Sequence, residues 1–158
     1  IRIGDRLMVD NRVGYVTKMT SRYVVLKGAD GTEALIPNDA LMSNTVINQS
    51  YSDKNMWTSL PVQVAYGTDL DLALSLLKQA ADQPRVLKNP GPNAFVTLFA
   101  DSGINLELGF WVADPENGFM GLKSDINLAI WRLFKQHHIE IPFPQREVRI
   151  IGDKPAQA

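Results

Sequence analysis

The sequence predicts a mixed fold in which a small, strongly bent β domain is followed by a two-layered α+β domain. Residues 5–50 contain short runs of strand-forming residues broken by turn residues, which is typical of small barrels. After residues 52–55 the spacing of apolar residues changes, and two segments of helical periodicity alternate with strand-like segments. The chain has 158 residues, which is enough for one ordinary domain or two small ones.

Five short strands are predicted in the first domain, because β-branched and aromatic residues gather between turn residues. They cover residues 6–9, 13–19, 22–27, 32–36 and 46–48. Gly14 lies inside the second run, where a glycine indicates either a bulge or a close approach of two backbone segments. The pair Asp30-Gly31 predicts a hairpin turn, because glycine accepts the positive φ that such turns require.

Pro37 and Asn38 mark the end of the fourth strand. Proline has no N–H group to donate to a strand ladder, so we expect the strand to stop at Pro37. Asn38 can cap a helix start, which predicts one helical turn over residues 39–42 that redirects the chain toward the last strand. The alternative interpretation of the same residues is an ordinary loop.

The second domain opens with a strand over residues 57–66 and then a helix. Thr68 precedes Asp71 by three residues, a spacing that resembles a capping box. Apolar residues at i, i+4, i+7 and i+11 predict the buried face of this helix. They are Leu70, Leu74, Leu77 and Ala81. Pro84 is expected to follow the helix end, and residues 94–100 form the next strand.

The remaining elements complete the order β-α-β-β-α-β. Residues 104–112 alternate between apolar and other side chains, as in a strand buried on one face. A second helix is expected over residues 122–137, and residues 147–151 predict a last strand. This is the ferredoxin-like arrangement, in which two helices cover one face of an antiparallel sheet.

The sequence therefore predicts a β domain at residues 1–56, an α/β domain at residues 57–151 and a tail at residues 152–158. The link at residues 53–55 is short, so we expect the two domains to touch rather than to move freely.

Composition excludes several function classes. The hydrophobic fraction of 45% and the charged fraction of 21% are those of a folded protein. The net charge is −1, and neither domain has the basic excess that phosphate binding requires. Cysteine is absent, which excludes disulfides, thiolate metal sites and a cysteine nucleophile. No stretch approaches the roughly 20 apolar residues that span a bilayer, and no signal peptide is present.

Histidines and paired carboxylates are the first candidates for chemistry. His137 and His138 are adjacent, whereas a helical metal-binding pair is spaced one turn apart. A position at a helix end is therefore the favoured interpretation. Asp69 and Asp71 could act as paired carboxylates, but stabilisation of a helix N-terminus explains them more simply.

Trp57, Trp111 and Trp131 are scattered and have no accompanying cluster of Lys or Arg, so core or subunit contacts are favoured over a base-stacking platform. Gly28-Ala29-Asp30-Gly31 has no helix behind it, so it does not form a dinucleotide-binding fingerprint. No nucleophile, base and orienting group can be combined. We predict no catalytic residue, no cofactor and no metal site.

Several motifs along the chain occur together in one known family. In order they read IGDRLMV, RVGYVTKM, GADGTEALIPNDAL, VINQS, VAYGTDLDLALSLLKQAA and IEIPFPQREV. With these motifs the chain resembles the cytoplasmic region of the small-conductance mechanosensitive channels, the MscS family, over residues 3–151. The block running from Asp-Gly through Ile-Pro-Asn to Asn-x-Ser is the most specific of them.

The resemblance implies an architecture and a function. In the family, membrane helices lead into an Sm-like five-stranded barrel and then a ferredoxin-like domain. Copies assemble, usually as heptamers, into a hollow cage in the cytoplasm below a pore in the bacterial inner membrane. Membrane tension opens the pore and releases ions and small osmolytes after osmotic downshock. The chain begins with Ile1 rather than Met, so we expect membrane helices before it in a longer protein.

The resemblance also assigns structural roles residue by residue. Gly4-Asp5 matches the start of the β domain, Gly14 the strand glycine and Asp30-Gly31 the hairpin turn. Pro37-Asn38 matches the residues that end the fourth strand in the family. Asn48 and Ser50 match the Asn-x-Ser motif at the end of its β domain. The chain departs from the family pattern in two places. Arg22 is followed by Tyr23-Val24 rather than small hydroxyl residues, and residues 152–155 represent the carboxy-terminal barrel strand only in part.

Two other function classes remain as alternatives. Sm-like barrels elsewhere bind RNA, but they need a positive surface, and residues 1–58 are nearly neutral. A ferredoxin-like module that senses a small molecule would need a ligand cleft between paired domains. Our interpretation is a vestibule domain of a mechanosensitive channel, soluble and without catalysis, that assembles as a homo-oligomer without nucleic acid.

Overall fold

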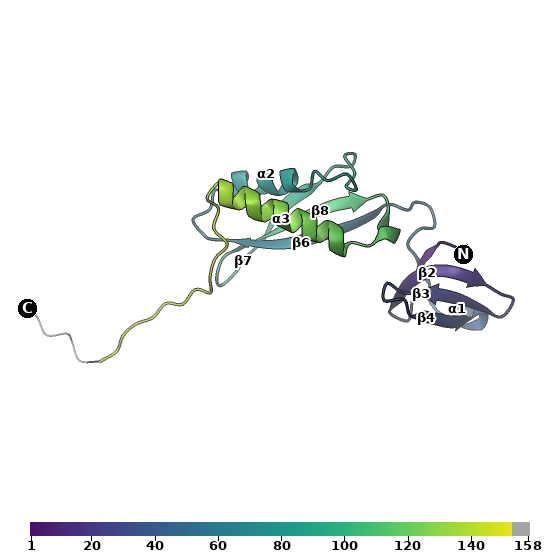
Figure 1. The fold of residues 1–158 in the computed structure, drawn as a ribbon. Helices are drawn as coiled ribbons and strands as arrows, with labels where there is room; N and C mark the ends of the chain where they lie inside the picture. The colour runs from purple at the N-terminus through teal and green to yellow at the C-terminus, as the bar shows by residue number, and fades with distance from the viewer. Residues whose placement is uncertain (153–158) are drawn as a thin grey trace, which may run out of the picture.

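The computed structural model describes residues 1–152 and contains two antiparallel sheets, each with its own hydrophobic core. The amino-terminal sheet and the helix-covered sheet lie end to end in an elongated molecule (Figure 1). The first core holds side chains from residues 7–36, and the second holds side chains from residues 60–134. We refer to the two parts as the β domain and the α/β domain.

The β domain is a single five-stranded sheet in the order β4-β3-β2-β1-β5. Its elements are β1 (Arg6–Val9), β2 (Arg12–Met19), β3 (Tyr23–Lys27), β4 (Glu33–Pro37), α1 (Asn38–Ser43) and β5 (Ile47–Asn48). The prediction of five short strands is confirmed. The edge strands β4 and β5 are not joined by a ladder, so hydrogen bonds do not close the sheet into a ring.

Gly14 lies where two strands approach closely. A Cβ atom at this position would be 2.6 Å from the carbonyl oxygen of Lys27 and 2.9 Å from Cγ of Leu26. The irregularity in the β2–β3 ladder falls between Val16 and Lys18. Of the two predicted explanations for Gly14, the close approach is therefore the one that the structure supports.

Pro37 is the last residue of β4, as predicted, and α1 follows it directly. The predicted capping role of Asn38 is wrong. Asn38 is the first residue of α1, and no side chain caps this helix. The Asn38 side chain instead donates a hydrogen bond to the carbonyl oxygen of Thr20 at 3.4 Å. This contact with the β2–β3 connection could not be foreseen from local sequence.

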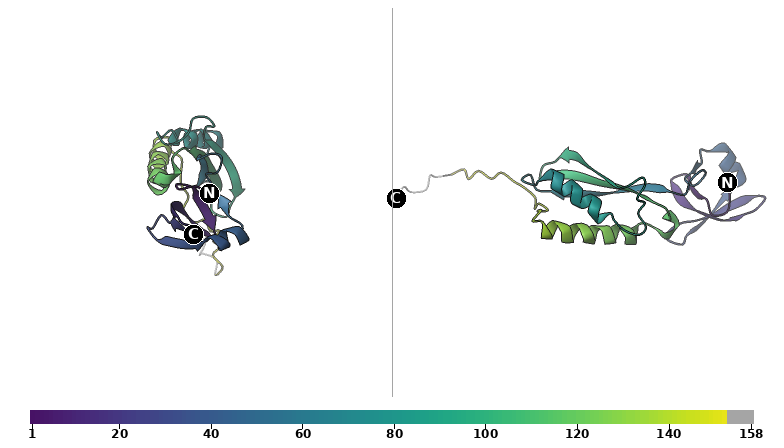
Figure 2. Two further views of the ribbon diagram at one scale, coloured as in Figure 1. Left: turned by 90° about the vertical axis from the view of Figure 1, so that its right-hand side faces the viewer. Right: turned by 90° about the horizontal axis from the view of Figure 1, so that it is seen from above.

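The α/β domain is a three-stranded sheet in the order β6-β8-β7 with helices on one face (Figure 2). Its elements are β6 (Met56–Val64), α2 (Leu70–Ala80), β7 (Asn93–Phe99), β8 (Ile104–Val112), the 3-10 helix η1 (Pro115–Asn117) and α3 (Met120–Gln136). Pro61 is accommodated because β6 is an edge strand.

The alternation predicted for the central strand is confirmed. Five apolar side chains of β8 are buried beneath the helices: Ile104, Leu106, Leu108, Phe110 and Val112. The polar residues between them face the other side of the sheet, where Asn105 accepts a hydrogen bond from Gln63 at 2.9 Å. Period-two patterning therefore correctly identified the face of the sheet that is buried.

The first helix differs from its prediction in its cap and in its buried face. Asp69, not Thr68, is the N-cap, and its carboxylate accepts a hydrogen bond from Leu72 N at 3.2 Å. The fully buried side chains of α2 are Ala73, Leu76, Leu77 and Ala80. The predicted Leu70 and Leu74 are only partly buried. Two of the four, Ala73 and Ala80, are small, which lets the helix approach the sheet closely.

The predicted last strand at residues 147–151 is wrong for the single chain. Residues 140–150 form no helix or strand, and Ile150 is 97% exposed. After Gln145 N donates to Ser102 Oγ at 3.1 Å, the chain leaves the sheet on the side opposite the β domain (Figure 1). A strand needs a partner, and no sheet edge accompanies this segment. Of the predicted tail, residues 153–158 lie outside the described part of the chain.

Candidate functional site at the junction of the two domains

Asp5 accepts hydrogen bonds that tie the two ends of the β domain together. Its carboxylate accepts from Arg2 N at 2.9 Å, from Asn48 Nδ2 at 3.0 Å and from Ser50 Oγ at 3.0 Å. Arg2 lies at the start of the domain, whereas Asn48 and Ser50 lie at its end, 43 and 45 residues after Asp5. A carboxylate with several donors is a strong acceptor, so the start of β1 is fixed against the segment after β5.

Further hydrogen bonds extend this cluster into the chain that leaves the domain. Arg6 N donates to Ser50 Oγ at 3.0 Å, and Gln49 N donates to Arg6 O at 2.8 Å. Asn48 Oδ1 accepts from Ser50 N at 3.1 Å, an Asx-type turn. The chain therefore enters the link to β6 from a fixed position. We name Asp5, Asn48 and Ser50 the Asp5 cluster.

The hydrogen bonds at Asp5 affect its ionisation. The Asn48 side chain, followed by Arg2 N and Ser50, holds the pKa of Asp5 below its ordinary value of 3.8, although partial burial opposes this. A lowered folded-state pKa stabilises the fold above the unfolded-state value, and this stabilisation is lost as the pH falls through the folded-state value. The Asp5 cluster therefore contributes fully at neutral pH and fades in acid.

The substitution Asp5→Asn tests this linkage. At pH 7 it is expected to lower the free energy of unfolding by about 1 kcal/mol, because a charged acceptor is lost. As the pH falls through the lowered pKa of Asp5, the difference from wild type should shrink, because the wild-type carboxyl then becomes protonated as well. Urea unfolding at a series of pH values from neutral to acid measures this, with the exposed Asp101→Asn as control. A difference that stays constant with pH would contradict the linkage.

The other residues singled out by the family resemblance lie in separate places. Gly4, with φ of +92°, adjoins the Asp5 cluster and donates from its backbone N to Val16 O at 2.7 Å. Asp30 and Gly31 form the β3–β4 turn, where Asp30 Oδ1 accepts from Thr32 N at 2.9 Å. Thus the structure brings four of the nine together, namely Gly4, Asp5, Asn48 and Ser50. The other five, Gly14, Asp30, Gly31, Pro37 and Asn38, lie in the sheet, its turn and the β4–α1 corner.

Arg6 connects the β domain to the α/β domain. Its guanidinium carbon lies 5.9 Å from the ring centroid of Tyr15 in β2 and 5.7 Å from that of Phe119, just before α3. Arg6 Nη1 also donates to Met56 Sδ at 2.9 Å, at the start of β6. Aromatic faces attract cations, so this side chain holds the two domains together. Sequence reasoning missed Arg6, because nothing local indicates a contact with Phe119.

A second arginine fixes the loop that carries Phe119. Arg85 Nε lies 2.8 Å from Asp114 Oδ2, and Arg85 Nη2 donates to Asp114 O at 3.0 Å and to Gly118 O at 2.8 Å. The hydrogen bond from Asn117, and then Arg85, lower the pKa of Asp114, although partial burial opposes them. The loop between β8 and α3 is therefore braced on both sides of η1, which positions Phe119 against Arg6.

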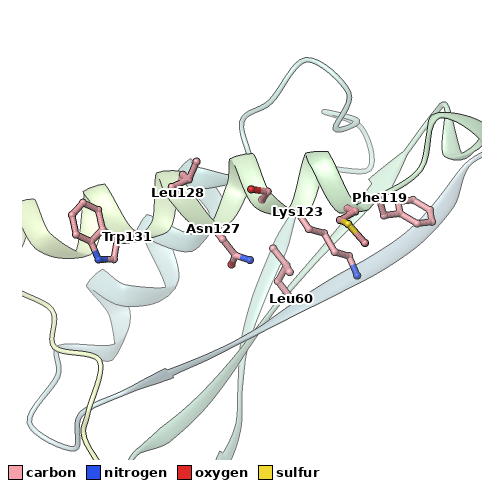
Figure 3. A pocket seen from close by; sticks show the side chains of 8 residues that line it. Leu60, Phe119, Lys123, Asn127, Leu128 and Trp131 are labelled. Atoms are coloured by element: carbon pink, nitrogen blue, oxygen red, sulfur yellow. The ribbon is translucent and has the colours of Figure 1, made fainter.

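An apolar groove runs along the outer side of α3. Figure 3 shows Trp131, Leu128, Asn127 and Lys123 along the helix, with Phe119 at its start and Leu60 of β6 below. The groove has a volume of about 900 Å³. Trp131 is 53% exposed, and Lys135 Nζ lies 4.7 Å from its ring centroid. Apolar surface of this kind commonly marks an interaction site.

The remaining candidate residues have structural positions. His137 is the C-cap of α3, and His138 follows it with φ of +57°. Within residues 1–152, no group of three or more His, Cys, Asp or Glu side chains is arranged to hold a metal ion. In the same residues, no helix combines the length and the apolar character needed to cross a bilayer.

Comparison with protein families agrees with both domains in order. The family profile described as the β-domain of mechanosensitive ion channels matches residues 1–51. The profile described as the C-terminal part of the mechanosensitive ion channel MscS matches residues 59–141. The fold and its junction thus define a class, the two-domain region found in mechanosensitive ion channels.

Individual relatives narrow the class further. The mechanosensitive channel MscK of Escherichia coli is 32% identical over 155 residues, which are 98% of this chain and 14% of that protein. An uncharacterized MscS family protein of Haemophilus influenzae is 34% identical over 151 residues, which are 95% of this chain and also 14% of the relative. The chain belongs to the MscS family, a family of membrane channels and not a class of enzymes. It spans about a seventh of the length of these relatives.

Solved structures agree in fold. The crystal structure of Helicobacter pylori MscS in its closed state matches with a TM-score of 0.82 and 25% identity, over 97% of this chain and 60% of that one. The cryo-EM structure of Arabidopsis thaliana MSL1 matches with a TM-score of 0.66 and 16% identity, over 92% and 53% of the two chains. The second match supports the fold alone.

Proposed function

We propose that this chain forms the cytoplasmic vestibule below the pore of a mechanosensitive channel in a bacterial inner membrane. The observation that carries the proposal is the match of both domains, in order, to the channel family profiles. The share of each relative that the chain covers leaves room for a membrane part elsewhere in a longer protein. Helices preceding the β domain would supply that part and would open under tension.

In this proposal the described residues act through shape and position, without catalysis. Ions and small osmolytes would pass through the water-filled space that the α/β domains surround. The Asp5 cluster and Arg6 would transmit the orientation of the membrane-proximal β domain to the α/β domain. We retain residues 1–56 and 57–151 as the two domains, with residues 152–158 as a tail.

Assembly of several copies is part of the same proposal. Within residues 1–152, neither edge of the α/β sheet pairs with a further strand, and the β7 edge exposes Phe95, Leu98 and Phe99. Trp131 and Met120 expose further apolar surface along α3. The exposed Ile150 lies in an extended segment without a partner strand. Unpaired edges and apolar patches favour pairing with further copies, and we propose a heptamer as in the family.

The oligomeric state of the full-length protein tests this proposal. Native mass spectrometry or cryo-EM after detergent extraction should find a closed ring, with seven copies expected. Ile150→Asp should reduce the fraction of rings, because it places charges where copies are proposed to meet. Glu147→Asp in the same segment preserves the charge and serves as control. Monomers alone for the wild-type protein would contradict the proposal.

A further inference from the structure

A cleft lies between the β domain and the loop that precedes α3. It has a volume of about 680 Å³, and its wall includes Arg2, Arg6, Tyr15, Gln49, Lys54 and Glu116. A smaller cavity of about 390 Å³ lies against the same Arg6 and Tyr15 and extends to Lys27 and Phe119. The larger volume is within the range of clefts that bind small molecules.

Arg6 faces this cleft as a cation without an anion. The hydrogen bond of its guanidinium to Met56 Sδ is to a weak acceptor, and its Nε atom is buried without a partner. Within residues 1–152 the only salt bridge is Arg85–Asp114. A partly buried charge without an opposite charge is unfavourable, and the two aromatic rings compensate for only part of this cost.

Two other buried polar atoms lack partners beside Arg6. They are Tyr15 Oη and Gln49 Oε1. Burial raises the pKa of Tyr15, although the nearby Arg6 side chain opposes the rise, and its hydroxyl therefore keeps its proton and can donate. With Nε of Arg6, these are the three buried side-chain atoms without a partner in the described chain, and all belong to residues of one cleft. Buried polar atoms normally have partners, so the two donors among these atoms, Arg6 Nε and Tyr15 Oη, retain the capacity to bond an acceptor.

The charges around the cleft favour an anion. Its wall holds three basic side chains, Arg2, Arg6 and Lys54, against the two acidic residues Asp5 and Glu116. The Asp5 carboxylate already accepts from Asn48, Ser50 and Arg2 N. Counted over these side chains, the wall therefore carries one more positive than negative charge.

We propose that this cleft binds a small organic carboxylate, with the carboxylate on Arg6 and Tyr15 and its carbon chain toward Lys54. The planar guanidinium of arginine matches the two oxygens of a carboxylate, which distinguishes this class from a halide ion. Ile3, Val16 and Pro115 supply apolar wall for a short carbon chain. A ligand that touches both domains stabilises their mutual arrangement by mass action. The inference does not depend on the proposed channel function.

A titration of the 158-residue chain with succinate tests the site. The Nε–Hε resonance of Arg6 should shift saturably in a ¹⁵N-correlated NMR spectrum, and the melting temperature should rise over the same concentrations. The ionic strength is held constant at about 0.15 M, where general screening does not change during the titration. Chloride and sulfate replace succinate in parallel titrations. No saturable shift, or an equal shift with chloride or sulfate, would overturn the proposal.

Three variants separate the site from general effects of charge. Arg6→Gln should abolish the saturable response. Lys54→Gln, an exposed residue at the mouth, should weaken binding about threefold to tenfold, as expected for loss of one favourable charge contact. Because Lys54 is exposed, the Lys54→Gln variant should fold normally, so it still tests the site if Arg6→Gln fails to fold. Lys78→Gln, in the last turn of α2, should leave binding unchanged, and weakening equal to that of Lys54→Gln would overturn the assignment.

Discussion

Replacing Phe134 with alanine is expected to lower the free energy of unfolding of the α/β domain by about 3–5 kcal/mol. Phe134 lies in α3, is 2% exposed and belongs to the core between the helices and the sheet. Its removal takes away apolar contact area and leaves a cavity that rigid β8 cannot fill. The three tryptophans, Trp57, Trp111 and Trp131, all lie in this domain, so tryptophan fluorescence during urea unfolding measures the effect.

Phe143→Ala is the matched control for this prediction. Phe143 is 79% exposed and follows α3 in the extended segment. The same atoms are removed, but no cavity forms, so the change should stay within about 0.5 kcal/mol. Equal losses at the two positions would contradict the placement of α3 on the sheet.

Gly14→Val is expected to destabilise the β domain by about 1–3 kcal/mol. The new Cβ would be 2.6 Å from Lys27 O, a backbone atom that is held in the ladder between β2 and β3. The clash can therefore be removed only if the two strands separate, which also disturbs Leu26 in the core. Hydrogen exchange of the β2 and β3 amides measures the loss within this domain.

Gly121→Ala is the control for the Gly14 substitution. An added Cβ at Gly121 in α3 meets nothing within 4 Å, and its backbone is helical. Alanine favours a helix over glycine by about 1 kcal/mol, so this variant should be at least as stable as the wild type. Unchanged exchange in β2 and β3 of Gly14→Val would refute the close approach.

Local pattern predicted most of the secondary structure, because strands and turns in this chain follow from neighbouring residues. Strand β8 is an example, since its alternation fixed both its extent and its buried face. Strand β4 ends at Pro37 because proline has no N–H group to donate to the ladder. The caps were less predictable. Thr68 and Asp69 can both accept a hydrogen bond at a helix start, and in the structure Asp69 is the one that does.

Long-range contacts could not be predicted in the same way. Residues 147–151 have the composition of a strand, but a strand also needs a partner, and the chain leaves the sheet after Gln145 (Figure 1). The resemblance selected Asp5, Asn48 and Ser50 separately, without indicating that they bond to one another. Arg6 and Phe119 are far apart in sequence, so their contact becomes visible only in the folded molecule.

In the proposed vestibule the junction would have a mechanical role. Hydrogen bonds at Asp5 make the start of the β domain and its exit one unit. Arg6 joins that unit to Met56 and Phe119, and Arg85 braces the loop behind Phe119. Movement at the membrane side would thus reach the α/β domain through few, identifiable contacts. Chains of packed and hydrogen-bonded side chains of this kind can carry coupling between two regions.

Patch-clamp recording of the full-length protein in giant liposomes tests the central claim most directly. Suction on the patch should open discrete conductance steps that close when tension is released, and liposomes without the protein should show none. Membranes that hold the full-length protein and yet carry no tension-dependent current up to rupture would contradict the account.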